Sequence, residues 1–178
     1  MKARRKRWVA AIVALVVIAG ISLLLGHIQR GGSRPHLYVK YHYTAEATYQ
    51  DIEISRSELI YTYFPKEIAK EKCANWIKQS PCWTEEDLRT SQVSLSEDEI
   101  DDLVSLIRKT GFMDLESTYG GADESQRYYA HGITVKIGEK EKAVVYQSCP
   151  DASPMPDAFE KLMDKLFELV SKRFNTRL

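Results

Sequence analysis

Residues 95–112, LSEDEIDDLVSLIRKTGF, decide much of the fold because they predict a helix with a defined start. Ser96 with Glu99 three positions later has the pattern of a capping box. Leu95 and Ile100 can form the hydrophobic staple across that cap. An amphipathic helix is therefore expected here.

The same helix is expected to have an apolar face, an acidic face and a defined end. Its apolar residues recur at helical spacing: Ile100, Leu103, Val104 and Ile107. Gly111 suits the left-handed closing position, with Phe112 folding back as the Schellman contact. The acidic residues of 97–102 are expected to form the solvated face and to interact with the positive end of the helix dipole.

Three strands are predicted before this helix. Residues 36–44 (HLYVKYHYT) alternate in polarity, as do residues 50–55 (QDIEIS), and residues 59–64 (LIYTYF) are β-branched and aromatic. The polar residues between the second and third runs suit a turn. Residues 65–93 show no strong periodicity and are expected to be irregular.

A hairpin and a second helix are predicted after residue 112. Residues 128–137 and 142–147 alternate around a turn at 138–141. Ser153 followed by Pro154 predicts a helix start. A broad apolar stripe follows: Phe159, Leu162, Met163, Leu166, Leu169, Val170 and Phe174.

The element order β-β-β-irregular-α-β-β-α predicts an α+β fold for residues 36–178. Two layers are expected, with the helices packed on one face of a mainly antiparallel sheet. The 143 residues of this segment suit one domain with its own core.

Residues 8–26, WVAAIVALVVIAGISLLLG, carry no charge and would span about 28 Å as a helix. Five basic residues in the tail 1–7 precede this stretch, which predicts a cytoplasmic N-terminus. The sequence therefore predicts a single-pass anchor in the cell membrane, a linker at 27–35 and an extracytoplasmic domain. A cleaved signal peptide and a buried core helix are the alternatives.

The formal charge of zero hides an asymmetry between the ends of the chain. Residues 1–7 carry +5, and the rest of the chain carries −5. An acidic body is unlike a nucleic-acid-binding surface, which needs a basic face for phosphate groups. Nucleic acid is therefore not an expected partner.

Three cysteines occur. If the domain is extracytoplasmic, they lie in an oxidising compartment, where disulfides can form. A disulfide between Cys73 and Cys82 is predicted because it would stabilise a segment of weak periodicity. Free thiols and a pair including Cys149 remain as alternatives. Cys149, at a strand end, is expected to be a small buried side chain rather than a nucleophile.

No catalytic or metal-binding motif is present. The histidines at 27, 36, 42 and 131 form no H-x-x-H or H-E-x-x-H pattern, so neither metal nor cofactor is expected. A hydrolase could use His131 with Ser148 and Asp123, or His131 with Cys149. The chain lacks a G-x-S-x-G elbow and a phosphate-binding glycine loop, so catalysis is the weaker interpretation.

Tyrosines gather in the predicted strands: Tyr38, Tyr41, Tyr43, Tyr49, Tyr61, Tyr63, Tyr128 and Tyr129. Half-buried sheet faces favour tyrosine, which packs its ring and leaves its hydroxyl in water. Packing is therefore the first explanation. An exposed aromatic platform for a protein partner or a glycan is the second.

The later half resembles uncharacterised exported or membrane-anchored prokaryotic domains of unknown function. The likeness covers about residues 95–170, from Leu95-Ser96-Glu97 through Thr110-Gly111-Phe112 and the tyrosine-rich hairpin to Pro156 and Leu166. It implies an extracytoplasmic α+β domain and no catalytic residues. We therefore expect a membrane-anchored binding or interaction module, with an accessory subunit of a membrane complex and a hydrolase as alternatives.

Overall fold

The computed structural model describes residues 36–76, 81–121 and 128–175. The chain divides into two units, 1–35 and 36–178. The predicted tail, anchor and linker form the first unit and lie outside the described residues. The strands of the second unit are β1 (Leu37–Ala45), β2 (Thr48–Ser55), β3 (Glu58–Tyr63), β4 (Arg89–Ser94), β5 (Thr118–Gly120), β6 (Tyr129–Ile137) and β7 (Lys140–Ser148). Its helices are α2 (Lys66–Lys72), α3 (Glu97–Thr110) and α4 (Asp157–Phe174), with 3₁₀ turns η2 (Glu85–Asp87) and η3 (Phe112–Asp114).

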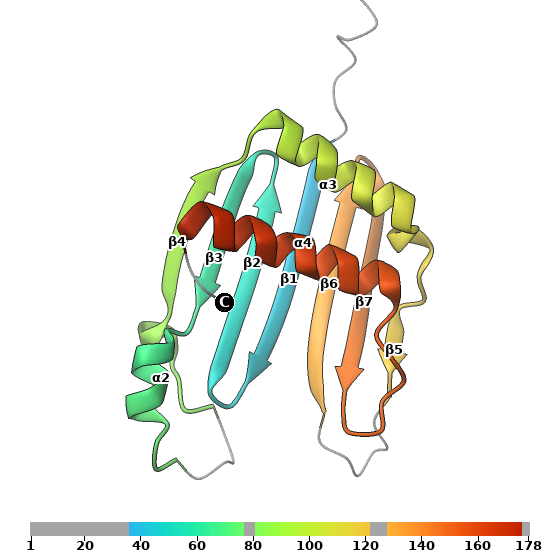
Figure 1. The fold of residues 1–178 in the computed structure, drawn as a ribbon. Helices are drawn as coiled ribbons and strands as arrows, with labels where there is room; N and C mark the ends of the chain where they lie inside the picture. Colours follow the sequence, from blue (N-terminus) through green and yellow to red (C-terminus); the bar gives the residue numbers. More distant parts are fainter. Residues whose placement is uncertain (1–35, 77–80, 122–127, 176–178) are drawn as a thin grey trace, which may run out of the picture. The chain divides into compact units, whose positions relative to one another are not determined.

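The strands form one seven-stranded sheet in the order β4-β3-β2-β1-β6-β7-β5 (Figure 1). Neighbouring strands are antiparallel except β5 and β7, which are parallel. The predicted mixed α+β fold with a mainly antiparallel sheet is thus confirmed. The central pairing of β1 with β6 joins the two halves of the chain.

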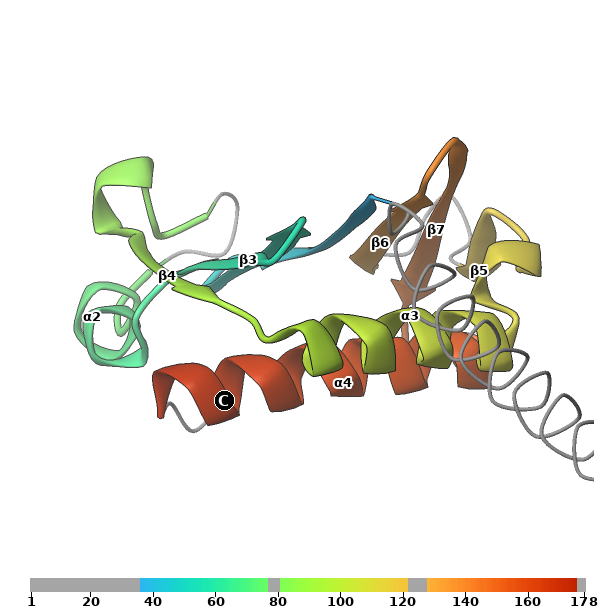
Figure 2. The same cartoon turned by 90° about the horizontal axis from the view of Figure 1, so that it is seen from above.

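Helices α3 and α4 lie on one face of this sheet (Figure 2). The core fills the space between the two layers, because alternate strand residues face the helices. Its fully buried members come from both layers: Val39, Tyr41, Ile52, Ile54, Leu59, Ile133, Val135, Val144, Leu103, Ile107, Phe159, Leu162 and Leu166. The strands extend beyond α4 on the side away from α3 (Figure 1).

Helix α3 has the predicted caps at both ends. The backbone N–H of Glu99 donates to the Ser96 hydroxyl over 3.3 Å, and the Ser96 N–H donates to the Glu99 carboxylate over 2.9 Å. Gly111 has φ 72° and ψ 28°, the left-handed conformation that glycine adopts without strain. Phe112 is fully buried. The local signals in residues 95–112 were therefore sufficient for this helix.

Glu99 departs from the expectation that the acidic residues of 97–102 form a solvated face. It is buried, with 8% of its surface exposed. Its carboxylate pairs with Arg173 and, over 3.1 Å, with Lys172, both on α4. The Arg173 hydrogen bond, which outweighs the effect of burial, and the further bonds from Ser96 and Lys172 lower its pKa to about 2. Glu99 therefore links α3 to α4.

Replacing Glu99 with glutamine is expected to lower the free energy of unfolding by about 1–3 kcal/mol at pH 7. A lowered folded-state pKa means that the ion pair stabilises the fold above the unfolded-state value near 4.5 and is lost as the pH falls toward 2. Urea unfolding at pH 7, 4 and 2.5 should therefore show the difference between wild type and E99Q shrinking. Asp98→Asn, at an exposed position in the same first turn of α3, should cost less than about 1 kcal/mol at pH 7. A difference that stays constant down to pH 2.5 would contradict this role.

The region predicted to be irregular contains helix α2 and strand β4. Residues 128–137 and 142–147 form the predicted hairpin, but its turn is shorter than expected. Ile137 pairs with Lys140, and Gly138 has φ 60°, as in a two-residue hairpin turn that places glycine first. Strand β5 lies between η3 and this hairpin, where no strand was predicted.

The second predicted helix begins later than Ser153. Pro156 has φ −59° and ψ 135°, and α4 starts at Asp157. Proline restricts the residue before it to extended backbone, so Pro154 and Pro156 keep residues 153 and 155 out of a helix. The apolar stripe of α4 is nonetheless placed as expected on the sheet.

In residues 36–76, 81–121 and 128–175, no helix is long and apolar enough to cross a bilayer. The predicted anchor at 8–26 is not among these residues and stays a prediction.

Candidate functional site

Four half-buried side chains form a row across four neighbouring strands on the helix side of the sheet. In strand order they are Tyr63 on β3, Gln50 on β2, Tyr43 on β1 and His131 on β6, and each is paired in register with the next. We call this set the polar row. At the usual strand spacing it spans about 15 Å. Along each strand, the row lies two positions from a buried residue of the same face, namely Ile52, Tyr41 or Ile133. It lies toward the strand ends that extend past α4.

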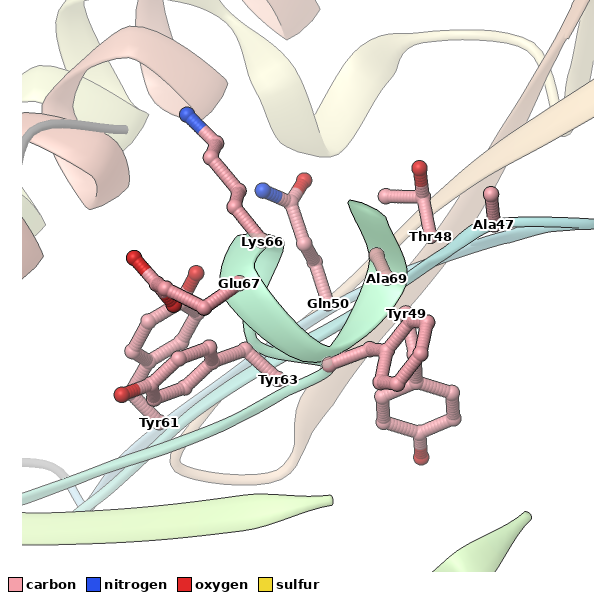
Figure 3. Close-up of a pocket in the computed structure, with 10 residues that line it drawn as sticks. Ala47, Thr48, Tyr49, Gln50, Tyr61, Tyr63, Lys66, Glu67 and Ala69 are labelled. Atoms are coloured by element: carbon pink, nitrogen blue, oxygen red, sulfur yellow. The ribbon is translucent and has the colours of Figure 1, made fainter. Parts of the chain in front are cut away.

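One end of the polar row lines a pocket of about 190 Å³. Its walls come from the β1–β2 turn, from β2 and β3 and from the first turn of α2 (Figure 3). The lining residues are Ala47, Thr48, Tyr49, Gln50, Tyr61, Tyr63, Phe64, Lys66, Glu67 and Ala69. Most of them are aromatic, small or uncharged, with one cationic and one anionic side chain from α2.

The aromatic part of the pocket is held rigidly by stacking. The rings of Tyr61 and Tyr63 lie 4.7 Å apart with an angle of 10° between their planes. Tyr61 is buried and also packs on Phe174 of α4, with ring centroids 6.3 Å apart. Burial raises the pKa of Tyr61 to about 12, although its hydrogen bond with the Gln50 side chain lowers it in part. The Tyr61 hydroxyl therefore stays protonated near pH 7.

The other end of the polar row contains His131. Its Nδ1 atom lies 3.0 Å from the hydroxyl of the buried Tyr41, and its ring stacks on Tyr43 with centroids 4.3 Å apart. Burial lowers the pKa of His131 and raises that of Tyr41. Both groups are neutral near pH 7, and donation by the Tyr41 hydroxyl to Nδ1 avoids a buried donor without an acceptor. Nε2 then carries the proton and is a hydrogen-bond donor.

In the described part of the chain, no hydrogen bond joins His131 to Ser148 or Cys149, the two nucleophiles of the hydrolase alternative. Ser148 lies on the same sheet face as His131, diagonally across from it, and pairs in register with Tyr129. In the described part of the chain, however, the hydrogen bond of His131 goes to Tyr41. Asp123 lies outside the described residues. His131 is therefore hydrogen-bonded to a phenol rather than to a candidate nucleophile, and the hydrolase stays a prediction.

Cys149 is half-buried rather than fully buried as predicted, and its thiol lies 2.6 Å from the carbonyl oxygen of Gly121. It follows the last residue of β7, where the strand leaves the sheet, so only part of its surface is covered. The thiol is thus directed to the backbone of the β5 end.

Cys73 and Cys82 lie at disulfide distance, with Cα atoms 5.7 Å apart. The pair joins the end of α2 to residues 82 and 83, which form hydrogen bonds with the β1–β2 turn. The N–H of Cys82 donates to the carbonyl of Glu46 over 2.8 Å, and the indole N–H of Trp83 donates to the carbonyl of Ala45 over 3.0 Å. These contacts hold the β1–β2 turn, next to which Ala47 and Thr48 line the pocket.

The remaining histidines do not join the polar row. His42 lies on the opposite face of the sheet, beside Asp51 at 3.5 Å, and His36 precedes β1. His27 lies outside the described residues. Among the residues that the structure describes, no three His, Cys, Asp or Glu side chains are grouped as they would be to hold a metal ion.

Sequence reasoning did not single out Gln50, Lys66 or Glu67. Gln50 occupies an inward-facing position of β2 that alternation would give to an apolar residue, since Ile52 and Ile54 share that face. An amide at such a position is a usable signal for a binding site. Lys66 and Glu67 could not be recognised from the sequence, because their place in the pocket depends on where α2 lies.

The fold and the site together define a two-layer α+β domain with an aromatic and polar pocket at one end of its sheet. No protein-family model matches the chain, and no curated protein matches it significantly. The resemblance of residues 95–170 to exported prokaryotic domains therefore stays a prediction.

Proposed function

We propose that the chain is a single-pass membrane protein whose outward-facing domain, 36–178, is a binding module. The anchor is residues 8–26, and the basic tail 1–7 faces the cytoplasm. The ligand contacts the polar row and the adjoining pocket. A protein partner at the membrane surface would use the same exposed end of the domain.

One observation carries the binding proposal: half-buried polar and aromatic side chains form a row, and one end of that row lines a pocket beside the core. Binding sites combine apolar and aromatic surface with a few placed polar groups. Sheet positions that serve only packing are more simply filled by apolar residues, as the neighbouring Ile52 and Ile133 are. Donation by the Tyr41 hydroxyl to Nδ1 leaves Nε2 of His131 protonated, and a protonated Nε2 supports a hydrogen-bond donor to a ligand over a base for hydrolysis.

Protease treatment of intact cells tests the orientation. In cells that make the full chain with a C-terminal tag, added protease is expected to remove the tag without lysis. A domain that is protected until the membrane is permeabilised would contradict an outward orientation. A mature chain that begins after residue 33 would show that residues 8–26 belong to a cleaved signal peptide and not to an anchor.

A fragment screen tests the binding function independently of the ligand's identity. The full chain in lipid nanodiscs is exposed to a library of small polar and aromatic compounds, with saturation-transfer NMR as the readout. Hits are expected to be lost in Tyr63→Ala and kept in Tyr38→Ala, because Tyr38 lies on the opposite sheet face. Hits that are insensitive to Tyr63→Ala would contradict this site.

A further inference from the structure

We propose that the pocket and the polar row bind a neutral saccharide, with one sugar ring on Tyr63 and further units along the row. This inference rests on the proposed binding function and names its ligand class. Four features of the site lead to it: a fixed aromatic platform, paired donors and acceptors, a low local charge, and an extended row of suitable groups.

The platform is the ring of Tyr63. This residue is half-exposed, whereas Tyr61 beneath it is buried and held against Phe174. The 10° angle between the two tyrosine planes fixes the orientation of the outer ring before any ligand arrives. A preorganised ring loses little conformational freedom on binding. Its face offers a flat apolar surface to the C–H groups of a sugar ring, and its hydroxyl stays available for a hydrogen bond.

The hydrogen-bonding groups match hydroxyls better than they match ions. The Gln50 amide has two donor hydrogens and an acceptor oxygen, of which the bond with Tyr61 uses only part. Thr48 adds a hydroxyl to the same wall. In Figure 3 the Gln50 amide and the Lys66 ammonium extend in the same direction. A sugar hydroxyl is both donor and acceptor, so neighbouring hydroxyls can satisfy this mixed set.

The charges of the domain disfavour anionic ligands, and the site itself has little net charge. Seven of the 25 basic residues precede residue 36, so the domain 36–178 has 18 basic and 25 acidic side chains and a formal charge of −7. This field opposes anions. The pocket itself has Lys66 and Glu67, which nearly cancel, and burial lowers the pKa of His131 so that the polar row is neutral.

The dimensions favour a chain of small units over one large ligand. The pocket volume of 190 Å³ is below the roughly 300–1,000 Å³ of sites for drug-sized ligands. It therefore suits one ring. Along the row, the stacked Tyr43 and His131 provide a second aromatic surface one and two strands away from Gln50, with the Nε2 donor beside it. An oligosaccharide lying across the strands would reach both ends.

Titration calorimetry with the full chain in nanodiscs tests this inference. The probes are cellohexaose, maltohexaose and chitohexaose with their monosaccharides, and the charged comparisons are hexagalacturonate and hexalysine. At least one neutral hexasaccharide is expected to bind more tightly than its monosaccharide. Tyr63→Ala should weaken binding about tenfold through loss of the stack, and Tyr63→Phe should retain most of it. Tyr43→Ala should weaken the hexasaccharide but leave the monosaccharide unchanged.

The controls separate this inference from the proposed function. Tyr38→Ala, on the opposite sheet face, should bind like wild type, and thermal unfolding confirms that each variant is folded. If no neutral saccharide binds while fragments or a charged probe still bind in a Tyr63-dependent manner, the saccharide proposal is wrong and the binding module stands. If nothing binds in a Tyr63-dependent manner, both proposals are wrong.

Discussion

Replacing Phe159 with alanine is expected to lower the free energy of unfolding by about 3–5 kcal/mol. Phe159 is fully buried near the start of α4. Its ring lies 6.3 Å from that of Phe112 and 6.4 Å from that of Tyr146, so it joins α4 to η3 and to β7. Removing the ring leaves a cavity that three separate elements would have to close, which makes relaxation costly.

The measurement is urea unfolding of the full chain in detergent micelles, followed by near-ultraviolet circular dichroism. Phe167→Ala, in the same helix, is the matched control. Phe167 is half-buried and packs edge-to-face on Tyr41 at 5.1 Å, so its loss should cost about 1–2 kcal/mol. Equal losses in the two variants would contradict the assignment of Phe159 to the centre of the core.

The parts of the fold that depend on local chemistry could be predicted from the sequence. The capping box at Ser96 and Glu99 and the left-handed Gly111 each involve residues a few positions apart, and they correctly define α3. The alternation of residues 36–44 and 50–55 likewise gave β1 and β2. Strand β4 was missed because, of its six residues RTSQVS, only Val93 is apolar, which is the composition of an exposed edge strand. Strand β5 has three residues, and its parallel pairing with β7 depends on tertiary contacts.

The candidate site depended on strand order, which no local pattern provides. Tyr41 and His131 are 90 positions apart and meet only because β1 and β6 are neighbours. The concentration of tyrosines was visible in the sequence, and packing explains the buried Tyr41 and Tyr61. The half-buried Tyr43 and Tyr63 belong instead to the polar row. Tyrosine therefore occupies both buried and half-buried positions on the same face of the sheet.

Replacing both Cys73 and Cys82 with serine is expected to lower the free energy of unfolding by about 2.5–3 kcal/mol under oxidising conditions. The two cysteines are nine positions apart, and a bond between them restricts the unfolded chain by closing that short loop. Thermal unfolding with and without reductant measures the effect, and peptide mapping without reductant establishes the bond. Cys149→Ser is the matched control, because this cysteine lies outside the loop and should change stability by less than about 0.5 kcal/mol. A wild-type chain that is insensitive to reductant would contradict a stabilising bond.

The same double variant should also weaken ligand binding, because the bond holds α2 against the rest of the site. Helix α2 buries none of its own residues, so packing alone fixes it poorly. Its exposed ion pair between Lys72 and Asp87 adds little stability. The Cys82 side of the bond, by contrast, is attached to the β1–β2 turn through Glu46. Without the bond, α2 can move its pocket residues Lys66, Glu67 and Ala69 away from Gln50. Hydrogen exchange in the double variant should therefore rise first in α2 and leave α3 protected, and a uniform rise across both helices would contradict this local role.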